Sequence, residues 1–464
     1  MPHREGGAPV RAAAKPRTNL PESLGPDALA PAQATDTATP PSSAPRSRRR
    51  QFAVLTAQIV VIAGVIVGAL NHLFGFPGLR DFGVKYRIDL DVYRLGGTLF
   101  RDGITLYGSM PPTAIGTYLP FTYPPLSAAL FSPLSYVSLN SAIVIVTAIS
   151  IGALAATVVV TLRSLGYESR TTVLWGTLGV LALVFAVEFE PVQSTLNYGQ
   201  INMILMALVT VDVLAKNPWL PRGTLIGIAA AIKLTPAVFV LYFLVRKDFR
   251  AAVMSGVGFL VATAIGYLVA SADSVKYWTT VLPDSNRIGN PGYPANQSVT
   301  GMLTRLGVAE EVRSSVWLAL SIAAAALVAF AMWRALRADQ PALALSLNAI
   351  LGLLASPVSW SHHWVWAVPL MVTLAALSYQ CFRVARAASI AAAAVVVSGL
   401  FLMWLAPHWR LGQGRWNGKN WPLLDQFFAA SYVWWALAAV VVAIIVATPR
   451  MNLRGADEQA LVAR

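Results

Sequence analysis

The sequence FAVLTAQIVVIAGVIVGALNHLF, residues 52–74, is an unbroken apolar run of 23 residues without a Lys, Arg, Asp or Glu. About 20 such residues allow a helix to cross the hydrocarbon core of a bilayer, and this run is longer than the apolar part of a signal peptide. Four arginines come shortly before it, at positions 46, 48, 49 and 50. By the positive-inside rule they predict a retained first span whose N-terminal side lies in the cytoplasm.

The composition of the whole chain agrees with a membrane protein. Of 464 residues, 56% are apolar and only 12% are charged, whereas a soluble domain carries about 25% charged residues. The net charge of +14 is therefore interpreted as a topology signal, and no nucleic-acid partner is expected. The single cysteine, Cys381, excludes a disulfide framework and a Cys-based metal site.

Further apolar runs extend this pattern to an all-α polytopic membrane protein with about twelve transmembrane helices and both termini inside. The stretch 222–246 is interrupted by Lys233 and Pro236. It is predicted to form two half-helices, because proline breaks the hydrogen-bond ladder and lysine is costly at the bilayer centre. Segment 125–138 is short and contains proline, so it is interpreted as interfacial or re-entrant. The other runs lie at 139–162, 171–189, 200–215, 250–271, 314–336, 342–357, 363–380, 385–407 and 427–447.

The chain divides into three regions. Residues 1–50 are rich in Pro, Ala, Ser and Thr, and they are predicted to be a disordered cytoplasmic tail because they bury too little apolar surface. The membrane domain covers 51–448, and 449–464 form a cytoplasmic C-terminal tail. Long loops commonly carry binding and catalytic residues, so function is expected on the outer face. The long outer loops are 75–124, 272–313 and 408–426.

The first outer loop carries two carboxylates, Asp89 and Asp91, soon after the first span. A carboxylate at a membrane–water boundary is well placed for acid–base catalysis. On an extended segment both side chains share one face, because the side-chain period is two. On a helix they point about 200° apart, so that only one can enter a cavity. The alternative is a solvated loop in which the carboxylates pair with Arg87 and Arg94.

Two further motifs place polar groups near the outer boundary. Tyr123, in the sequence LPFTYPP, could stack on a sugar or anchor the chain in the interfacial aromatic belt. Asn197, Gln200 and Asn202 are predicted to share one helix turn at the start of a span. Carboxamides are expensive in lipid, so they either face a cavity or form hydrogen bonds between helices.

Two adjacent histidines and an arginine complete the candidate groups. His362 and His363 lie at the outer end of another span and point about 100° apart on a helix, so they are not expected to ligate one metal together. One of them faces a phosphate or a base, or is a structural residue. Arg287, in the second long loop, could clamp a lipid phosphate through paired hydrogen bonds. The tryptophans of the last outer loop, Trp409 among them, are interpreted as aromatic-belt anchors.

In this order, the motifs resemble those of the polyprenol-phosphate-mannose-dependent α-(1→2)-mannosyltransferases of actinobacteria, which belong to the GT-C class of membrane glycosyltransferases. The resemblance covers roughly residues 52–448 and implies a GT-C-type helical bundle with a long first outer loop. The motifs that carry it are DLDVY (89–93) with the following Gly96-Gly97, FTYPP (121–125), NYGQIN (197–202), KLTP (233–236) and SPVSWSHHW (356–364).

The resemblance implies an enzyme of the cell membrane with its active site on the outer face. The donor would be polyprenyl-phosphate mannose, and the acceptor a mannoside hydroxyl of phosphatidylinositol mannoside or of lipomannan or lipoarabinomannan. A β-linked donor that gives an α-linked product requires inversion, hence one displacement with one base. Reading the family spacing as Asp-x-x-Val-Tyr assigns the base to Asp89, with Asp91 as second choice.

The resemblance also implies residues that bind the departing phosphate of the donor. Groups that neutralise its developing charge assist such a reaction. No metal or other cofactor is expected, because the donor has one phosphate and the carboxylates have no further ligands nearby in the sequence. The residues implied in binding the donor are His362, His363, Arg287, Tyr123, Asn197, Gln200 and Lys233.

Two other functions fit part of this pattern. Arabinofuranosyltransferases use polyprenyl-phosphate donors and have a related first loop. A lipid or sugar transporter also has broken helices with polar residues. Against a transporter, the polar motifs lie at the outer boundary rather than at mid-bilayer, and the sequence has no evident internal repeat. A scaffold protein would not need so many costly polar groups at one depth.

Overall fold

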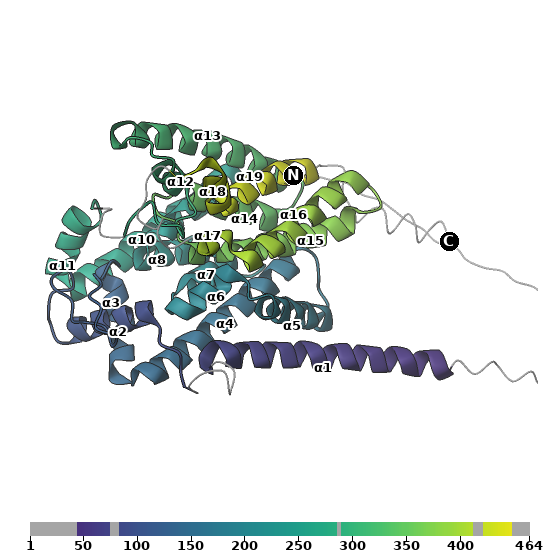
Figure 1. Ribbon diagram of the computed structural model, residues 1–464, viewed down its shortest axis with the longest axis horizontal. Coiled ribbons are helices and arrows are strands. Elements are labelled where there is room, and N and C mark those ends of the chain that lie inside the picture. Colours follow the sequence, from purple (N-terminus) through teal and green to yellow (C-terminus); the bar gives the residue numbers. More distant parts are fainter. Residues whose placement is uncertain (1–43, 75–82, 285–288, 412–420, 448–464) are drawn as a thin grey trace, which may run out of the picture. The chain divides into compact units, whose positions relative to one another are not determined.

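The computed structural model of the chain describes residues 44–74, 83–284, 289–411 and 421–447. Most of the predicted N-terminal tail, the C-terminal segment 449–464 and Arg287 lie outside the described residues. From Val54 onward, the described residues belong to one compact unit, which is built from helices joined by turns (Figure 1). The pairing of Asn296 with Trp360 is an isolated antiparallel bridge.

Six helices of the described residues are long and apolar enough to cross a bilayer, and two bent helix pairs bring this number to as many as eight. The bent pairs are α5 (Arg170–Ala186) with α6 (Glu190–Tyr198), at 80°, and α18 (Leu423–Ala429) with α19 (Ser431–Val446), at 65°. The prediction of an all-α polytopic membrane protein is confirmed. The long helices are α1 (Ala44–Phe74), α4 (Leu139–Ser164), α10 (Phe249–Val269), α13 (Glu310–Arg337), the 3-10 helix η5 (Ser361–Trp366) continued by α15 (Ala367–Cys381), and α16 (Arg386–Leu405) continued by α17 (Pro407–Arg410).

The predicted number of about twelve spans is not confirmed. Two of the predicted spans are short helices, α7 (Asn202–Leu214) and α14 (Pro341–Ala355). With 15 residues, α14 extends about 22 Å, less than the ~30 Å of a bilayer's hydrocarbon core. These helices end at turns rather than continuing, so their length alone does not establish them as full spans.

The stretch 222–246 is broken as predicted. Helix α8 (Thr224–Ile232) ends at Lys233, whose backbone is extended, and the chain resumes in the 3-10 helix η2 (Thr235–Phe239) and in α9 (Val240–Arg246). Pro236 lies in the first turn of η2, where its missing N–H costs no helical hydrogen bond. The break leaves the Lys233 side chain outside any continuous helix.

The loop that the sequence predicts to be the first outer one contains regular structure. It includes α2 (Ile88–Arg101), and the segment predicted to be interfacial forms α3 (Pro125–Phe131) and the 3-10 helix η1 (Ser132–Tyr136). Helix α2 packs closely on this segment at Gly97, where a Cβ would lie 2.7 Å from the carbonyl oxygen of Phe131. Helices α2, α3 and α11 (Ser271–Lys276) gather at the left-hand end of the long helices in Figure 1.

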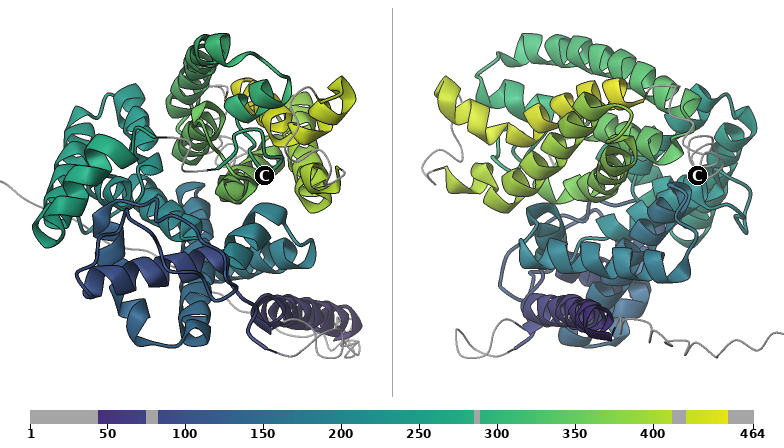
Figure 2. Two further views of the ribbon diagram at one scale, coloured as in Figure 1. Left: turned by 60° about the vertical axis from the view of Figure 1, so that its left-hand side comes forward. Right: turned by 90° about the vertical axis from the view of Figure 1, so that its right-hand side faces the viewer.

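Helices α13, α14, α15, α16 and α19 pack on one another, and in Figure 2 they form the green and yellow group. The 3-10 helix η5, which directly precedes α15, also contacts α6 and α7. Residues 361–366 are thereby placed beside the break between α6 and α7. The remaining described helices are the π-helix η3 (Tyr277–Val281) and α12 (Val299–Arg305).

Candidate active site

Asp89 and Asp91 lie in the first turn of α2 and face different surroundings. Asp89 lines a cavity of about 280 Å³. Asp91 is buried, and its Oδ2 accepts hydrogen bonds from the Tyr86 hydroxyl at 3.0 Å and from the backbone N–H of Ala114 at 2.7 Å. The helical alternative for this segment is therefore confirmed, since one of the two carboxylates faces a cavity.

Two arginines were the alternative partners of these carboxylates. Arg87 is buried and donates to Asn197 Oδ1 at 3.1 Å and to the carbonyl oxygen of His72. Arg94 donates to the carbonyl oxygen of Val137 at 3.2 Å. Both guanidinium groups are thus engaged elsewhere, and the alternative of a solvated loop held by ion pairs is wrong.

The cavity that Asp89 lines, which we call the carboxylate cavity, is slightly smaller than the roughly 300–1,000 Å³ usual for small-molecule sites. It lies between the first turn of α2, the loop at 119–123, the α6–α7 break and η5. Three residues predicted to bind the donor line it: Tyr123, Gln200 and His362. Its other walls are largely aromatic, with Tyr93, Tyr198, Tyr293, Trp360 and Trp409.

Gln200 connects Asp89 to Lys233. The Gln200 Nε2 donates to Asp89 Oδ2 at 2.7 Å, and its Oε1 accepts from the Tyr93 hydroxyl at 2.8 Å and from Lys233 Nζ at 3.4 Å. Lys233 Nζ also donates to Asn202 Oδ1 at 3.2 Å. The orientation of the Asp89 carboxylate is thus fixed by an amide whose other end faces a cation.

Burial raises the pKa of Asp89 above the ordinary value of 3.8, while the Gln200 hydrogen bond and the Lys233 cation oppose this shift. The N-terminal position in α2 also favours the anion, because the helix dipole is positive there. A carboxylate with a raised pKa is a stronger base than an exposed one. Asp89 therefore combines basicity with neighbours that stabilise its charged form.

The three carboxamides predicted to share one helix turn do not share one. Gly199 has a left-handed conformation with φ of 73° and ends α6, so Asn197 lies in α6, Gln200 in the break and Asn202 in α7. Only glycine fits this position easily, because a Cβ would lie 2.6 Å from Leu90 Cβ. The break directs Asn197 to a buried arginine, whereas Gln200 lines the carboxylate cavity.

His362 and His363 lie in η5, and their rings are nearly perpendicular, at 89° with centroids 4.7 Å apart. His362 is buried and lines the carboxylate cavity, and its Nε2 has no hydrogen-bond partner among the described residues. Its carbonyl oxygen accepts from the Thr195 hydroxyl at 2.7 Å and from Asn202 Nδ2 at 3.0 Å. These two bonds attach η5 to α6 and α7.

His363 and Lys233 line a second cavity of about 380 Å³, which we call the lysine cavity. The two histidines therefore serve different cavities, although they are adjacent in the sequence. The lysine cavity adjoins the carboxylate cavity, because four residues line both: Thr122, Tyr123, Gln200 and Trp360.

A third cavity of about 400 Å³, the apolar cavity, lies between α7, η2, α14 and η5. Aliphatic and aromatic side chains such as Leu205, Phe239 and Leu353 form most of its wall. It adjoins the lysine cavity through Leu234, Thr235, Ser356 and His363. The carboxylate, lysine and apolar cavities thus follow one another in this order. The described residues contain no group of three or more His, Cys, Asp and Glu that could hold a metal ion.

Tyr123 forms part of the wall between the carboxylate and lysine cavities. Its hydroxyl lies 2.7 Å from the Tyr93 hydroxyl and 3.0 Å from Gln200 Oε1, and Lys233 Nζ lies 5.2 Å from its ring centroid. The ring is buried, which does not fit the alternative of an interfacial anchor. The cation over the ring covers part of the surface that the sequence suggested for a sugar.

The sequence interpretation missed Glu190 and the role of Trp409. Glu190 is buried at the start of α6, and its Oε1 accepts from Trp409 Nε1 at 2.9 Å. Trp409 lines the carboxylate cavity, so its assignment to the aromatic belt is wrong. The signal was an acid at the end of the apolar run 171–189, where a charge is costly unless it has partners.

A carboxylate and a cation separated by one amide, with an apolar cavity alongside, suit a molecule that is polar at one end and lipid at the other. In a polytopic helical protein, this arrangement is a site for a molecule with a polar and a lipid part. More narrowly, the chain belongs to glycosyltransferase family 87, whose sequence model matches residues 121–357. The prediction of a membrane glycosyltransferase is thereby confirmed.

Characterised relatives match most of the chain. It is 40% identical over 413 residues to the polyprenol-phosphate-mannose-dependent alpha-(1-2)-phosphatidylinositol mannoside mannosyltransferase of Mycobacterium tuberculosis, covering 86% of this chain and 92% of the relative. The protein of the same name from Mycolicibacterium smegmatis is 39% identical over 420 residues, covering 86% and 91%. A phosphatidylinositol pentamannoside mannosyltransferase of the latter organism is 35% identical over 358 residues, covering 76% and 82%. No solved structure matches the chain.

Proposed function

We propose that the chain transfers mannose from polyprenol phosphate mannose to a hydroxyl of phosphatidylinositol mannoside and forms an α-(1→2) linkage. The observation that carries this proposal is the placement of Asp89 in a cavity, one amide away from Lys233. The names of the relatives support the choice of donor and acceptor. Those relatives are mannosyltransferases, which does not favour an arabinofuranosyltransferase or a transporter.

Asp89 acts as the base of a single inverting displacement. As the bond between the mannose C1 and the phosphate oxygen breaks, the acceptor hydroxyl bonds to C1 and gives its proton to the Asp89 carboxylate. Two features support this role: the carboxylate faces the cavity, and burial raises its pKa. Asp91 faces no such space, because its Oδ2 is occupied by two protein hydrogen bonds.

The departing phosphate is bound in the lysine cavity. Lys233 supplies the positive charge that a phosphate requires as it leaves, and His363 lines the same space. Among the described residues, Lys233 Nζ donates to two amides and lies over the Tyr123 ring rather than pairing with an acid, so its charge is available to an anion. His362, by contrast, lines the carboxylate cavity and is placed to hydrogen-bond a sugar hydroxyl.

The apolar cavity accommodates the first isoprene units of the donor. It adjoins the lysine cavity, so a lipid chain that starts at the phosphate can enter it directly. The acceptor and the donor sugar then lie in the carboxylate cavity, the phosphate lies in the lysine cavity, and the lipid chain lies in the apolar cavity.

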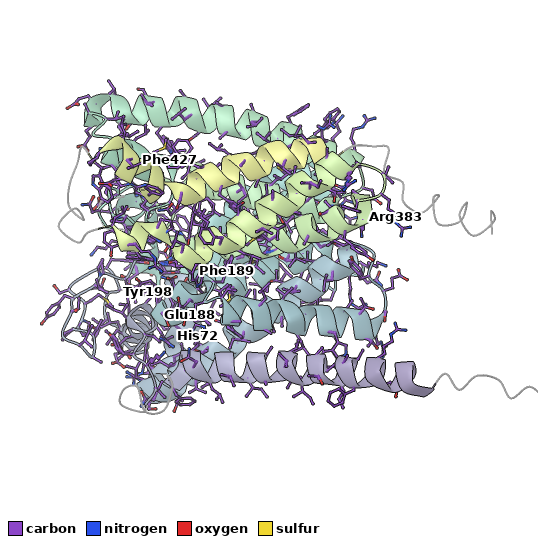
Figure 3. All side chains as sticks on the ribbon, turned by 45° about the vertical axis from the view of Figure 1, so that its right-hand side comes forward. His72, Glu188, Phe189, Tyr198, Arg383 and Phe427 are labelled. Carbon is purple, nitrogen blue, oxygen red and sulfur yellow. The ribbon has the colours of Figure 1, made fainter. Side chains whose placement is uncertain are left out.

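The active site lies on the outer face of the cell membrane, and both termini lie in the cytoplasm. Arg383, which follows α15, lies at the opposite end of the helices from Tyr198, which lines the carboxylate cavity (Figure 3). Arginines also occupy the last turns of α4 and α13, at 163, 334 and 337. The positive-inside rule then assigns the end with the arginines to the cytoplasm.

Transfer from a labelled donor tests the proposed function. Membranes that contain the chain are supplied with radiolabelled polyprenol phosphate mannose and, in separate reactions, with phosphatidylinositol mannosides or with lipomannan. The expected product is a labelled glycolipid that releases mannose to an α-(1→2)-specific mannosidase. Transfer of arabinose from its polyprenyl phosphate instead, or movement of lipid across vesicles without any transfer, would refute the proposal.

A further inference from the structure

Glu190 collects hydrogen bonds from four separate segments of the chain. Its Oε1 accepts from Ser194 Oγ at 2.7 Å, from Ser361 Oγ at 2.7 Å and from Trp409 Nε1 at 2.9 Å, and its Oε2 accepts from the Tyr432 hydroxyl at 2.9 Å. The donors lie in α6, η5, α17 and α19. A buried carboxylate is costly unless it is satisfied in this way, so its retention calls for an explanation.

Two of these four bonds lead to the walls of the carboxylate cavity. Trp409 lines the cavity directly, with its N–H turned to Glu190 and its ring in edge-to-face contact with Tyr293 at 5.9 Å. Ser361 directly precedes His362, which lines the same cavity. Glu190 itself lines none of the three cavities. Its influence on a substrate therefore passes through the side chains that it holds.

The walls that depend on Glu190 belong to one cavity only. Trp409 and His362 line the carboxylate cavity, but neither lines the lysine cavity or the apolar cavity. Tyr293 extends the same wall, and it also contacts Trp360 edge-to-face at 5.9 Å. In this aromatic wall the Trp409 N–H is engaged with Glu190, and aromatic rings bind the apolar faces of sugars.

We propose that Glu190 is a positioning residue for the acceptor: through Trp409 and Ser361 it fixes the wall against which the acceptor sugar binds beside Asp89. The inference rests on the proposed function. It adds one positioning residue and a separation between the residues that bind the acceptor and those that bind the donor. Loss of the Glu190 contacts weakens acceptor binding much more than donor binding, because the lysine and apolar cavities still hold the phosphate and the lipid of the donor.

Steady-state kinetics of the purified chain in lipid nanodiscs test whether Glu190 affects acceptor binding separately from donor binding. The Michaelis constants for polyprenol phosphate mannose and for phosphatidylinositol mannoside are measured for wild type, Glu190→Gln, Ser361→Ala and Trp409→Phe. Hydrogen bonds to a charged group exceed neutral ones about twofold in strength, so Glu190→Gln is expected to raise the acceptor KM about tenfold. The donor KM stays within about twofold of wild type. Ser361→Ala removes a single bond and keeps the proposal testable if Glu190→Gln fails to fold.

Two comparisons separate positioning from general stability. Asp212→Asn alters another buried carboxylate, which accepts from the backbone N–H groups of Gly223 and Ile226, and is expected to change neither KM. In the double variant Glu190→Gln with Trp409→Phe, the acceptor KM is expected to equal that of the worse single variant, because Glu190 acts through Trp409. Equal rises in both Michaelis constants, or effects that multiply in the double variant, overturn the proposal.

Direct binding distinguishes failure of this proposal from failure of the proposed function. Binding of phosphatidylinositol mannoside is measured with donor absent, so the readout needs no turnover. If wild type binds the glycolipid but transfers no mannose, the proposed function is wrong and Glu190→Gln is still judged by its affinity for the glycolipid. If Glu190→Gln binds as tightly as wild type, or wild type does not bind, the positioning role is wrong.

Discussion

Replacing Asp89 with asparagine removes the proposed base and little else. The Gln200 Nε2 donates to Asp89 Oδ2 at 2.7 Å, and the carbonyl oxygen of an asparagine can accept the same bond in the same place. The side chain keeps its size, so the carboxylate cavity keeps its shape. Loss of a general base lowers the rate about 10²–10⁴-fold, equivalent to about 3–5 kcal/mol of transition-state stabilisation.

Asp91→Asn is the matched control, two residues away in the same helix turn. Both of its protein hydrogen bonds, from Tyr86 and from Ala114, go to one oxygen, which an asparagine can supply. The bonds become neutral rather than charge-assisted, which costs about 1–2 kcal/mol of stability. Asp91 does not line the carboxylate cavity, so transfer is expected to stay within about tenfold of wild type.

The assay is single-turnover transfer from radiolabelled donor bound to excess enzyme, with protein abundance and melting temperature measured in parallel. Single-turnover conditions report the chemical step without product release. The expected order of rates is wild type, then Asp91→Asn, then Asp89→Asn by a wide margin. A larger loss for Asp91→Asn at normal abundance, or full activity of Asp89→Asn, would refute the assignment of the base.

Three further outcomes are expected. Lys233→Met removes a cation that lowers the pKa of Asp89, so the acidic limb of the pH–rate profile moves to higher pH, which kcat/KM for the acceptor measured across pH reports. His363→Ala raises the donor KM about tenfold and leaves the acceptor KM unchanged in the same kinetic assay. Gly199→Ala strains a residue with φ of 73° and forces its Cβ to within 2.6 Å of Leu90 Cβ, so thermal denaturation should show a loss of about 2 kcal/mol or more.

The sequence predicts the class of fold well because bilayer physics is simple. An uncharged run of 23 residues such as 52–74 has no stable alternative to a helix in lipid. The broken stretch at Lys233 and Pro236 could also be predicted, since both residues oppose a continuous span. The number of spans stays a prediction, because the 13-residue helix α7 and the 15-residue helix α14 have the composition of full spans but are shorter than the other candidate spans.

The candidate site could also be predicted in part, because polar residues within apolar sequence stand out. Asp89, Gln200, Lys233 and His362 are polar groups in apolar surroundings, and the structure brings all four to the carboxylate and lysine cavities. Which groups face inward depends on single dihedral angles. The left-handed turn at Gly199 separates Asn197 from Gln200 and directs them to different partners, and no periodicity argument contains that turn.

The role of Glu190 could not be predicted from the residue alone, because it depends on partners that are distant in the sequence. Donors from residues 194, 361, 409 and 432 converge on its carboxylate, and His408 Nε2 lies 3.8 Å from its Oε1; these positions are linked by the fold rather than by spacing. The acid itself could be noticed in the sequence. Its partners could not, because each of them, taken alone, is an ordinary serine, tryptophan or tyrosine.

The groups of the site converge because the helices break where they do. A helix in lipid satisfies its own backbone, so it can be interrupted only where the freed groups face protein or a polar cavity. Three interruptions, at Gly199, at Lys233 and at 356–360 before η5, border the lysine cavity and its neighbours. Each one places a polar side chain at a point where no continuous helix could hold it. The breaks at Gly199, at Lys233 and before η5 therefore bring the polar side chains of the site together, whereas the residues at the bends between α5 and α6 and between α18 and α19 line none of the three cavities.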